Sequence, residues 1–234
     1  MEILCVIPAR SGSKGLINKN IKPLNGKPMM VYSIECSKKS KYVNRTIVST
    51  NSEKYAEIAK FNNAEVPFLR NENTSTDNIH SVYAVIELLE KLSTEKGYNP
   101  DITIMLLPTS PLRNVETLDL AIEKFLNHQN EVDSLISVYN LNKSKYHLRE
   151  INDQGLKPLT DIVPTNFQRD KKEGSICVLN GSIYISKTKS LIKNKTFHTE
   201  KATFFEMSLL ESIDIDTIED FKMAELILLK NLKK

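Results

Sequence analysis

Short apolar runs alternate with longer amphipathic segments through most of this chain. Apolar or β-branched runs predict strands at 3–7, 45–50, 102–107 and 134–138. Apolar residues at helical spacing predict helices at 29–38, 52–61, 82–92, 115–125 and 217–229. Three shorter strands are expected at 65–68, 182–185 and 203–207. This alternation predicts an α/β fold with a doubly wound, mostly parallel sheet that helices cover on both faces.

Length and composition narrow the class of protein. The 234 residues suffice for one large α/β domain, so we expect residues 1–234 to form a single domain. The net charge is only +3, and no basic stripe with interleaved aromatic residues indicates nucleic-acid binding. Cys5, Cys36 and Cys177 are odd in number and far apart, which indicates neither a disulfide framework nor a zinc site. Because no segment has the pattern of a signal peptide or a membrane span, we expect a cytoplasmic protein without membrane partners.

The loop that follows the first predicted strand combines small residues with three cations. The strand ends at Pro8, and Arg10, Lys14 and Lys19 come next. Uncovered backbone amides together with cations are what a triphosphate requires of a binding loop. The spacing matches neither the Walker A loop nor the dinucleotide-binding glycine motif. From composition alone, a basic surface turn is the alternative.

Two aspartates near the C-terminus are separated by one residue. In extended chain, Asp214 and Asp216 point to the same side. Two converging carboxylates without a neighbouring cation in sequence indicate a divalent metal, and oxygen ligands together with phosphate favour Mg²⁺. The alternative is that Asp216 caps the last helix, with Glu219 completing a capping box.

Residues 140–178 interrupt the alternation of strands and helices. The segment is polar and irregular, and a structureless stretch of this length inside a compact domain indicates a function of its own. Its basic residues are Lys143, Lys145, His147, Arg149, Arg169, Lys171 and Lys172.

Four stretches, in order, are similar to those of the CMP-sialic acid synthetases (acylneuraminate cytidylyltransferases). They are residues 7–15 with Lys19 and Asn20, then 106–113, 180–185 and 212–217. The resemblance spans nearly the whole chain and implies a Rossmann-like nucleotidyltransferase fold. It also implies transfer of CMP from CTP to the anomeric hydroxyl of a nine-carbon keto acid sugar, with release of pyrophosphate.

The resemblance assigns roles to residues of this chain. It implies catalytic roles for Arg10, Lys19, Asp214 and Asp216, with Mg²⁺ held by the two aspartates. The residues implied to bind the nucleotide are Ala9, Arg10, Ser13, Lys14, Lys19, Asn20, Arg70 and Ser81. Those implied to bind the sugar are Leu107, Thr109, Ser110, Arg169 and Asn180. For Arg113, a substrate contact and a structural clamp on its loop remain open.

The sequence also departs from the family in two places. In the family, a segment corresponding to 140–178 is an arm that reaches a second subunit, so we expect a homodimer. Here the His-Pro before the family's sugar-binding lysine is missing, and the run at 168–174 matches poorly. Leu107 stands where the family commonly has Gln, which favours a legionaminic or pseudaminic acceptor over N-acetylneuraminic acid.

Two other functions stay open from the sequence. One is transfer to the eight-carbon sugar Kdo, although its synthetases usually carry a Gln-Gly-Asp-like turn where this chain has residues 108–111. The other is a nucleotide-binding scaffold that has lost catalytic activity. The presence of Lys19, Asp214 and Asp216 speaks against the scaffold.

Overall fold

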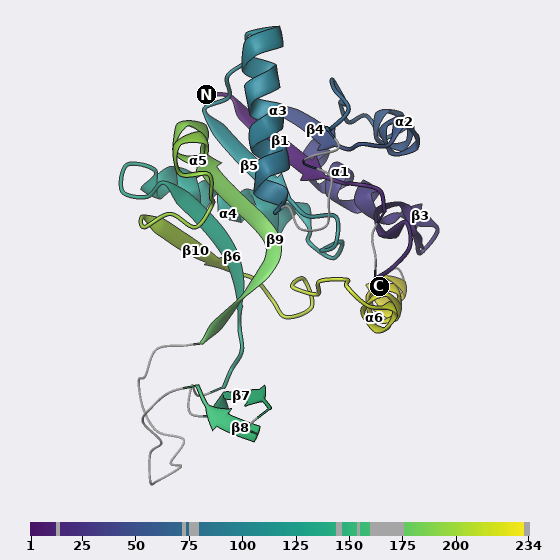
Figure 1. The fold of residues 1–234 in the computed structure, drawn as a ribbon, viewed down its shortest axis with the longest axis vertical. Coiled ribbons are helices and arrows are strands. Elements are labelled where there is room, and N and C mark those ends of the chain that lie inside the picture. Colours follow the sequence, from purple (N-terminus) through teal and green to yellow (C-terminus); the bar gives the residue numbers. More distant parts are fainter. Residues whose placement is uncertain are drawn as a thin grey trace.

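A computed structural model describes residues 1–12, 15–71, 74, 80–143, 147–153, 155–159 and 176–231. Its centre is a six-stranded sheet in the order β10-β6-β9-β5-β1-β4, with β9 antiparallel to both neighbours and the other strands pointing one way (Figure 1). The strands are β1 (Ile3–Pro8), β4 (Arg45–Ser49), β5 (Ile102–Leu106), β6 (Ser134–Asn140), β9 (Cys177–Lys187) and β10 (Ala202–Glu206).

Helices cover both faces of the sheet, because every second side chain of a buried strand faces the opposite layer. In β1, Cys5 and Ile7 pack in a core with α1, α2 and α4, whereas Leu4 and Val6 pack against α3 and α5. The helices are α1 (Met29–Lys39), α2 (Glu53–Phe61), α3 (Ser81–Lys96), α4 (Val115–His128) and α5 (Thr188–Asn194). The predicted doubly wound sheet is therefore confirmed.

A third apolar cluster fixes the segment that carries the two aspartates. Ile215 is fully buried and packs with Leu24 and Met29 and with Phe221 of α6 (Ile218–Asn231). Burying one such side chain contributes about 1.5–3 kcal/mol. The cluster also includes residues near η1 (Lys19–Ile21) and the short pair β2 (Pro23–Leu24) and β3 (Lys27–Pro28). The apolar residue between Asp214 and Asp216 is thus the anchor of that segment.

Four local features differ from the sequence-based expectations. The predicted strand at 65–68 is wrong, since Glu65 forms only an isolated bridge with Ile47. Strand β9 extends well beyond the predicted 182–185, and α5 was not predicted. The arm contains an unpredicted hairpin of β7 (Arg149–Asn152) and β8 (Gly155–Pro158).

Among the described helices, none is both long and apolar enough to cross a membrane.

Candidate functional site

Three segments meet beyond the carboxyl ends of β1 and β5, where ligands bind in open α/β sheets. The backbone N–H of Ile215 donates to the Thr109 carbonyl at 2.8 Å, which joins the 212–217 segment to the turn after β5. A Cβ added to Gly15 would lie 3.1 Å from the Asp216 carbonyl oxygen, so the loop after β1 closes on the same segment. The sequence motifs thus converge on one place in the fold.

Internal hydrogen bonds shape the loop after β1. Buried Ala9 donates its N–H to the Ser49 carbonyl at 2.9 Å, and Ser11 donates its N–H to the Asn51 side chain at the same distance. The Asn20 amide donates to the Arg10 carbonyl at 2.9 Å. Of the predicted nucleotide-binding residues, Ser13 and Lys14 lie outside the described residues.

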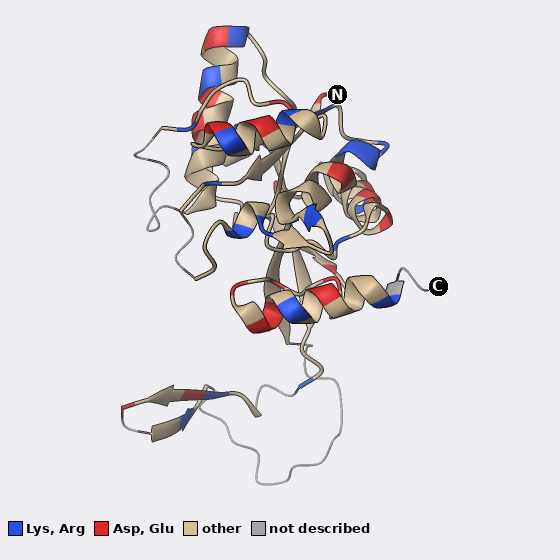
Figure 2. Cartoon of the chain, turned by 90° about the vertical axis from the view of Figure 1, so that its right-hand side faces the viewer, with Lys and Arg blue, Asp and Glu red and all other residues tan. Residues whose placement is uncertain are grey.

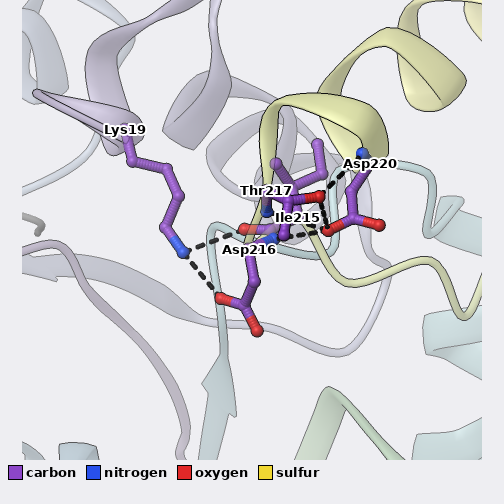
Figure 3. Close-up of polar contacts among 5 residues, drawn as sticks. All are labelled: Lys19, Ile215, Asp216, Thr217 and Asp220. Atoms are coloured by element: carbon purple, nitrogen blue, oxygen red, sulfur yellow. Dashed lines mark hydrogen bonds and ion pairs between the residues drawn. The ribbon is translucent and has the colours of Figure 1, made fainter. Parts of the chain in front are cut away.

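Lys19 connects this loop to the aspartate segment. Its Nζ donates to the Asp216 carboxylate and to the Ile215 carbonyl, both at 2.9 Å (Figure 3). The Lys19 side chain is only 14% exposed, whereas that of Asp216 is 72% exposed. Lys19, which we expect to bind the phosphates, therefore lies within hydrogen-bonding distance of Asp216, which we expect to bind the metal.

Asp214 has a different environment from Asp216. The residue is accessible to solvent, yet surrounding protein atoms partly desolvate its carboxylate and raise its pKa. A hydrogen bond from Thr109 lowers that pKa, and the charge of nearby Asp216 raises it. The raised pKa of Asp214 reflects an electrostatic cost of ionising it beside a second carboxylate, and a divalent cation would remove that cost.

The cap of α6 decides between the two explanations offered for Asp216. The Asp220 carboxylate accepts bonds from the Thr217 N–H at 2.8 Å and the Thr217 hydroxyl at 2.7 Å, and its own N–H donates back to that hydroxyl (Figure 3). This reciprocal pair is the capping box. The alternative in which Asp216 and Glu219 cap the helix is therefore wrong, and the Asp216 side chain takes no part in the cap.

The residues present fit Mg²⁺ only together with a phosphate ligand. Within the described part of the chain, no group of three or more His, Cys, Asp or Glu side chains converges as a self-sufficient metal cage. Mg²⁺ is commonly held by one or two carboxylates, with substrate phosphates and water completing its octahedron. Asp214 and Asp216 supply such a pair, beside the loop proposed for phosphate.

Arg70 adds a buried positive charge near the same loop. The residue is buried, and its Nε has no hydrogen-bond partner within the structure as described. Burial lowers the Arg70 pKa to about 10, with nearby Glu87 raising it and the charge of Arg10 lowering it further. Two close guanidinium groups, one with an orphaned donor, are a suitable environment for a polar or anionic ligand.

The comparison with protein families agrees with this arrangement. A model described as cytidylyltransferase matches residues 4–233. The chain belongs to the cytidylyltransferase family. The match covers the loop after β1, the turn after β5 and the aspartate segment together.

Individual relatives differ in the sugar that their names carry. The chain is 37% identical over 230 residues to a CMP-N,N′-diacetyllegionaminic acid synthase of Legionella pneumophila, covering 96% of this chain and 95% of that protein. It is 31% identical over 225 residues to an N-acylneuraminate cytidylyltransferase of Streptococcus agalactiae, covering 94% of this chain but only 52% of that protein. A solved CMP:2-keto-3-deoxy-manno-octonic acid synthetase with CTP has a TM-score of 0.72 over 99% of this chain and all of that one. At 14% identity, this last likeness shows the fold alone.

The cytidylyltransferase residues predicted to bind sugar fall into three environments. Leu107 and Thr109 are half-buried at the end of β5, whereas Ser110 is fully buried and its hydroxyl has no partner in the described structure. Asn180 is buried, with its amide oxygen accepting from Ser137 and the Ser182 N–H and its amide nitrogen donating to Ser212. A substrate contact of Asn180 would have to replace one of these bonds, so the geometry favours a positioning role. Arg169 lies outside the described residues.

Two residues of this cytidylyltransferase have clear structural roles. Buried Arg113 donates to the Ser182 carbonyl at 2.6 Å and to the Ser33 hydroxyl at 2.7 Å, which supports the clamp interpretation. Gly181 has φ +68°, and a Cβ there would lie 3.5 Å from the Leu107 side chain and 3.7 Å from the Asp214 carboxylate. The Leu107 side chain and the Asp214 carboxylate thus both lie next to Gly181, a proximity that sequence spacing alone does not reveal.

Proposed function

We propose that this cytidylyltransferase transfers CMP from CTP to the anomeric hydroxyl of a sialic-acid-like nonulosonic acid. The hydroxyl oxygen attacks the α-phosphorus, the bond to the β-phosphate oxygen breaks, pyrophosphate leaves, and the hydroxyl proton passes to solvent. The observation that carries the proposal is the meeting of Lys19, Asp214 and Asp216 beside the loop after β1. The names of the relatives supply the class of acceptor.

Positioning and charge neutralisation account for the catalysis in this proposal. Asp214 and Asp216 would hold Mg²⁺, which supplies charge neutralisation at the phosphates and acidifies a bound hydroxyl. Arg10 and Lys14 would hold the β- and γ-phosphates. Lys19 would exchange its bond with Asp216 for one with the departing pyrophosphate. Lys19 would then pair with a more highly charged anion, and Asp216 with the more highly charged Mg²⁺.

The nucleoside would lie on the side of the loop after β1 that faces Arg70 and Ser81. Arg70 offers its orphaned Nε, and Ser81 is the first residue of α3. Asn20 keeps the Arg10 carbonyl in place, which would orient the loop toward the ribose and base. Ala9 would contribute close backbone approach rather than a free N–H, since its N–H is bonded to Ser49.

The proposal is tested by measuring pyrophosphate release with Mg²⁺, each of the four nucleoside triphosphates and a panel of keto acid sugars. We expect release only with CTP and a nine-carbon acceptor. Release with Kdo instead would establish the eight-carbon alternative. Nucleotide binding without pyrophosphate release, whichever acceptor is added, would establish the scaffold.

The three cysteines are free thiols, which is consistent with the proposed cytoplasmic location. Cell fractionation tests that location.

We expect Leu107 to bias the acceptor toward a 9-deoxy sugar such as N,N′-diacetyllegionaminic acid, by roughly 10- to 100-fold over N-acetylneuraminic acid. Its side chain lies with the Asp214 carboxylate around Gly181, at the end of β5 where the acceptor sugar would bind. A sugar hydroxyl buried against leucine loses its hydrogen bond to water at a cost of ~1–3 kcal/mol, whereas a methyl group gains contact. The ratio of kcat/KM for the two sugars measures this preference.

Leu107→Gln should shift that ratio toward N-acetylneuraminic acid, and Leu107→Met, which stays apolar, should leave it near the wild-type value. The same ratio in all three proteins would mean that Leu107 only completes the core against α3, with which it packs. A wild-type preference for N-acetylneuraminic acid would also refute the prediction.

The hairpin β7–β8 supports a homodimer. It lies outside the helix-covered part of the sheet (Figure 1). Its exposed apolar residues are Ile151 (83%) and Leu156 (65%), and Leu159 (57%) directly follows it. A lone two-stranded hairpin is marginally stable in water, so a second copy is the natural cover for these side chains. Light scattering should give a dimer for the full chain and a monomer for Ile151→Ser combined with Leu156→Ser. Phe61→Ser, at an equally exposed apolar position of α2, should remain dimeric. A monomeric wild type at micromolar concentration would refute the dimer.

A further inference from the structure

Asp220 makes a contact that helix capping does not require. Besides its bonds with Thr217, the Asp220 carboxylate accepts a bond from the backbone N–H of Asp216 at 3.2 Å (Figure 3). Asp216 lies one residue outside the cap, so this bond adds nothing to the capping box itself. It instead holds the backbone of Asp216, which is a metal ligand in the proposed function.

We propose that Asp220 is a positioning residue for the metal ligand Asp216, and that it fixes the direction of the Asp216 carboxylate toward Mg²⁺. The inference rests on the proposed function. Residues that orient a metal ligand by hydrogen bonds commonly contribute 10- to 100-fold to metal affinity.

The contacts around Asp216 explain why Asp220 matters most in the loaded enzyme. The Asp216 carboxylate bonds to Lys19, the Asp216 carbonyl faces Gly15, and the Asp216 N–H bonds to Asp220. In the proposed reaction, Lys19 moves to the pyrophosphate and the carboxylate moves to the metal. The bond with Asp220 involves only the backbone N–H, so it persists through that exchange. Asp220 therefore keeps the ligand aimed when Lys19 no longer does.

The measurement is the gain in CTP affinity that Mg²⁺ provides, determined by calorimetry without an acceptor sugar, so that no turnover occurs. The dissociation constant for CTP is measured once with Mg²⁺ and once with EDTA, and the gain is the ratio of the two. The EDTA value reports on the nucleotide contacts alone, and the gain reports on the metal site. A residue with only a capping role changes the melting temperature but not the gain.

We expect Asp220→Ala to reduce the gain about 10-fold or more while leaving the EDTA value within about 3-fold of wild type. Asp220→Asn keeps an oxygen that can accept from the Asp216 and Thr217 N–H groups, so it should retain most of the gain. Glu219→Ala is the matched control, because it removes an exposed acidic side chain from the same first turn of α6. Its gain should equal that of the wild type.

Several outcomes would overturn the inference. If Mg²⁺ improves CTP affinity as much in Asp220→Ala as in the wild type, Asp220 only caps the helix. A gain in Asp220→Asn as low as in Asp220→Ala would mean that its charge acts, rather than its hydrogen bonds. Equal losses in Glu219→Ala would point to a general charge effect of the helix terminus. Asp216→Asn separates this failure from that of the proposed function, since an intact gain in Asp216→Asn would remove the metal from Asp216 altogether.

Discussion

Asp216→Asn should lower kcat about 10²-fold or more and change the melting temperature by only a few degrees. Loss of one charge-stabilising group at the reacting centre typically costs about 10²- to 10³-fold in rate. The Asp216 carboxylate is largely exposed, its ion pair with Lys19 is of a kind worth about 0–1 kcal/mol, and α6 is capped by Thr217 and Asp220 instead. An energy of about 1 kcal/mol corresponds to about 2–4 °C in a protein of this size. Steady-state kinetics at saturating CTP and thermal unfolding of the one variant measure both quantities.

Asp133→Asn is the matched control for this experiment. Asp133 pairs with Lys187 at 2.9 Å, the same distance as the pair of Lys19 with Asp216. It lies immediately before β6, at the opposite end of the sheet from the proposed site. We expect a similar small change in melting temperature and a normal rate. A normal rate in Asp216→Asn, together with a larger loss of stability, would make Asp216 a structural residue.

The sheet was predictable from the sequence because its central strands are apolar on every side. The residues of β1 have no polar face to place in solvent, and the same holds for most of β5. Only a sheet covered on both faces buries such strands. Where a strand carries polar residues at buried positions, as β9 does with Asn180, the apolar pattern was broken and the predicted strand was too short.

The misassigned strand at 65–68 and the unpredicted hairpin have a different cause. Pro67 has no N–H for a ladder, and Glu65 alone bonds to the edge strand β4. In the hairpin, the apolar residues are exposed, so they follow no pattern set by a core of this chain. A pattern that depends on burial cannot reveal an element that lacks a buried face.

The residues of the candidate site could be named from the sequence, but the hydrogen bonds between them could not. The order of Asp216, Thr217, Glu219 and Asp220 permits two capping boxes shifted by one residue, and only the structure selects the pair of Thr217 with Asp220. Equally, the bond of Lys19 with Asp216 joins residues 197 positions apart. The charges of α6 did not predict this bond, because acidic and basic residues both occur along the helix that leads to the C-terminus (Figure 2).

Lys19→Ala should lower kcat about 10²- to 10³-fold while leaving the affinity for CMP within about 3-fold of wild type. In the proposed reaction, the charge of Lys19 stabilises the departing pyrophosphate, and CMP contains no such group. Lys22→Ala is the matched control, because Lys22 is a neighbouring cation that faces the Phe221 ring at 5.4 Å rather than Asp216. The control should keep both the rate and the CMP affinity. If CMP affinity collapses while turnover at saturating CTP is preserved, Lys19 belongs to the nucleoside pocket.

A fall in rate alone would leave two explanations for Lys19, because it also holds the Ile215 carbonyl and the Asp216 carboxylate. The dependence of rate on Mg²⁺ separates them. If Lys19 acts only by positioning Asp216, the variant needs more Mg²⁺ for half-maximal rate, and saturating Mg²⁺ restores kcat. If its charge acts on the leaving group, kcat stays low at every Mg²⁺ concentration. We expect the second result, because the backbone bond of Asp216 with Asp220 remains in place when Lys19 is removed.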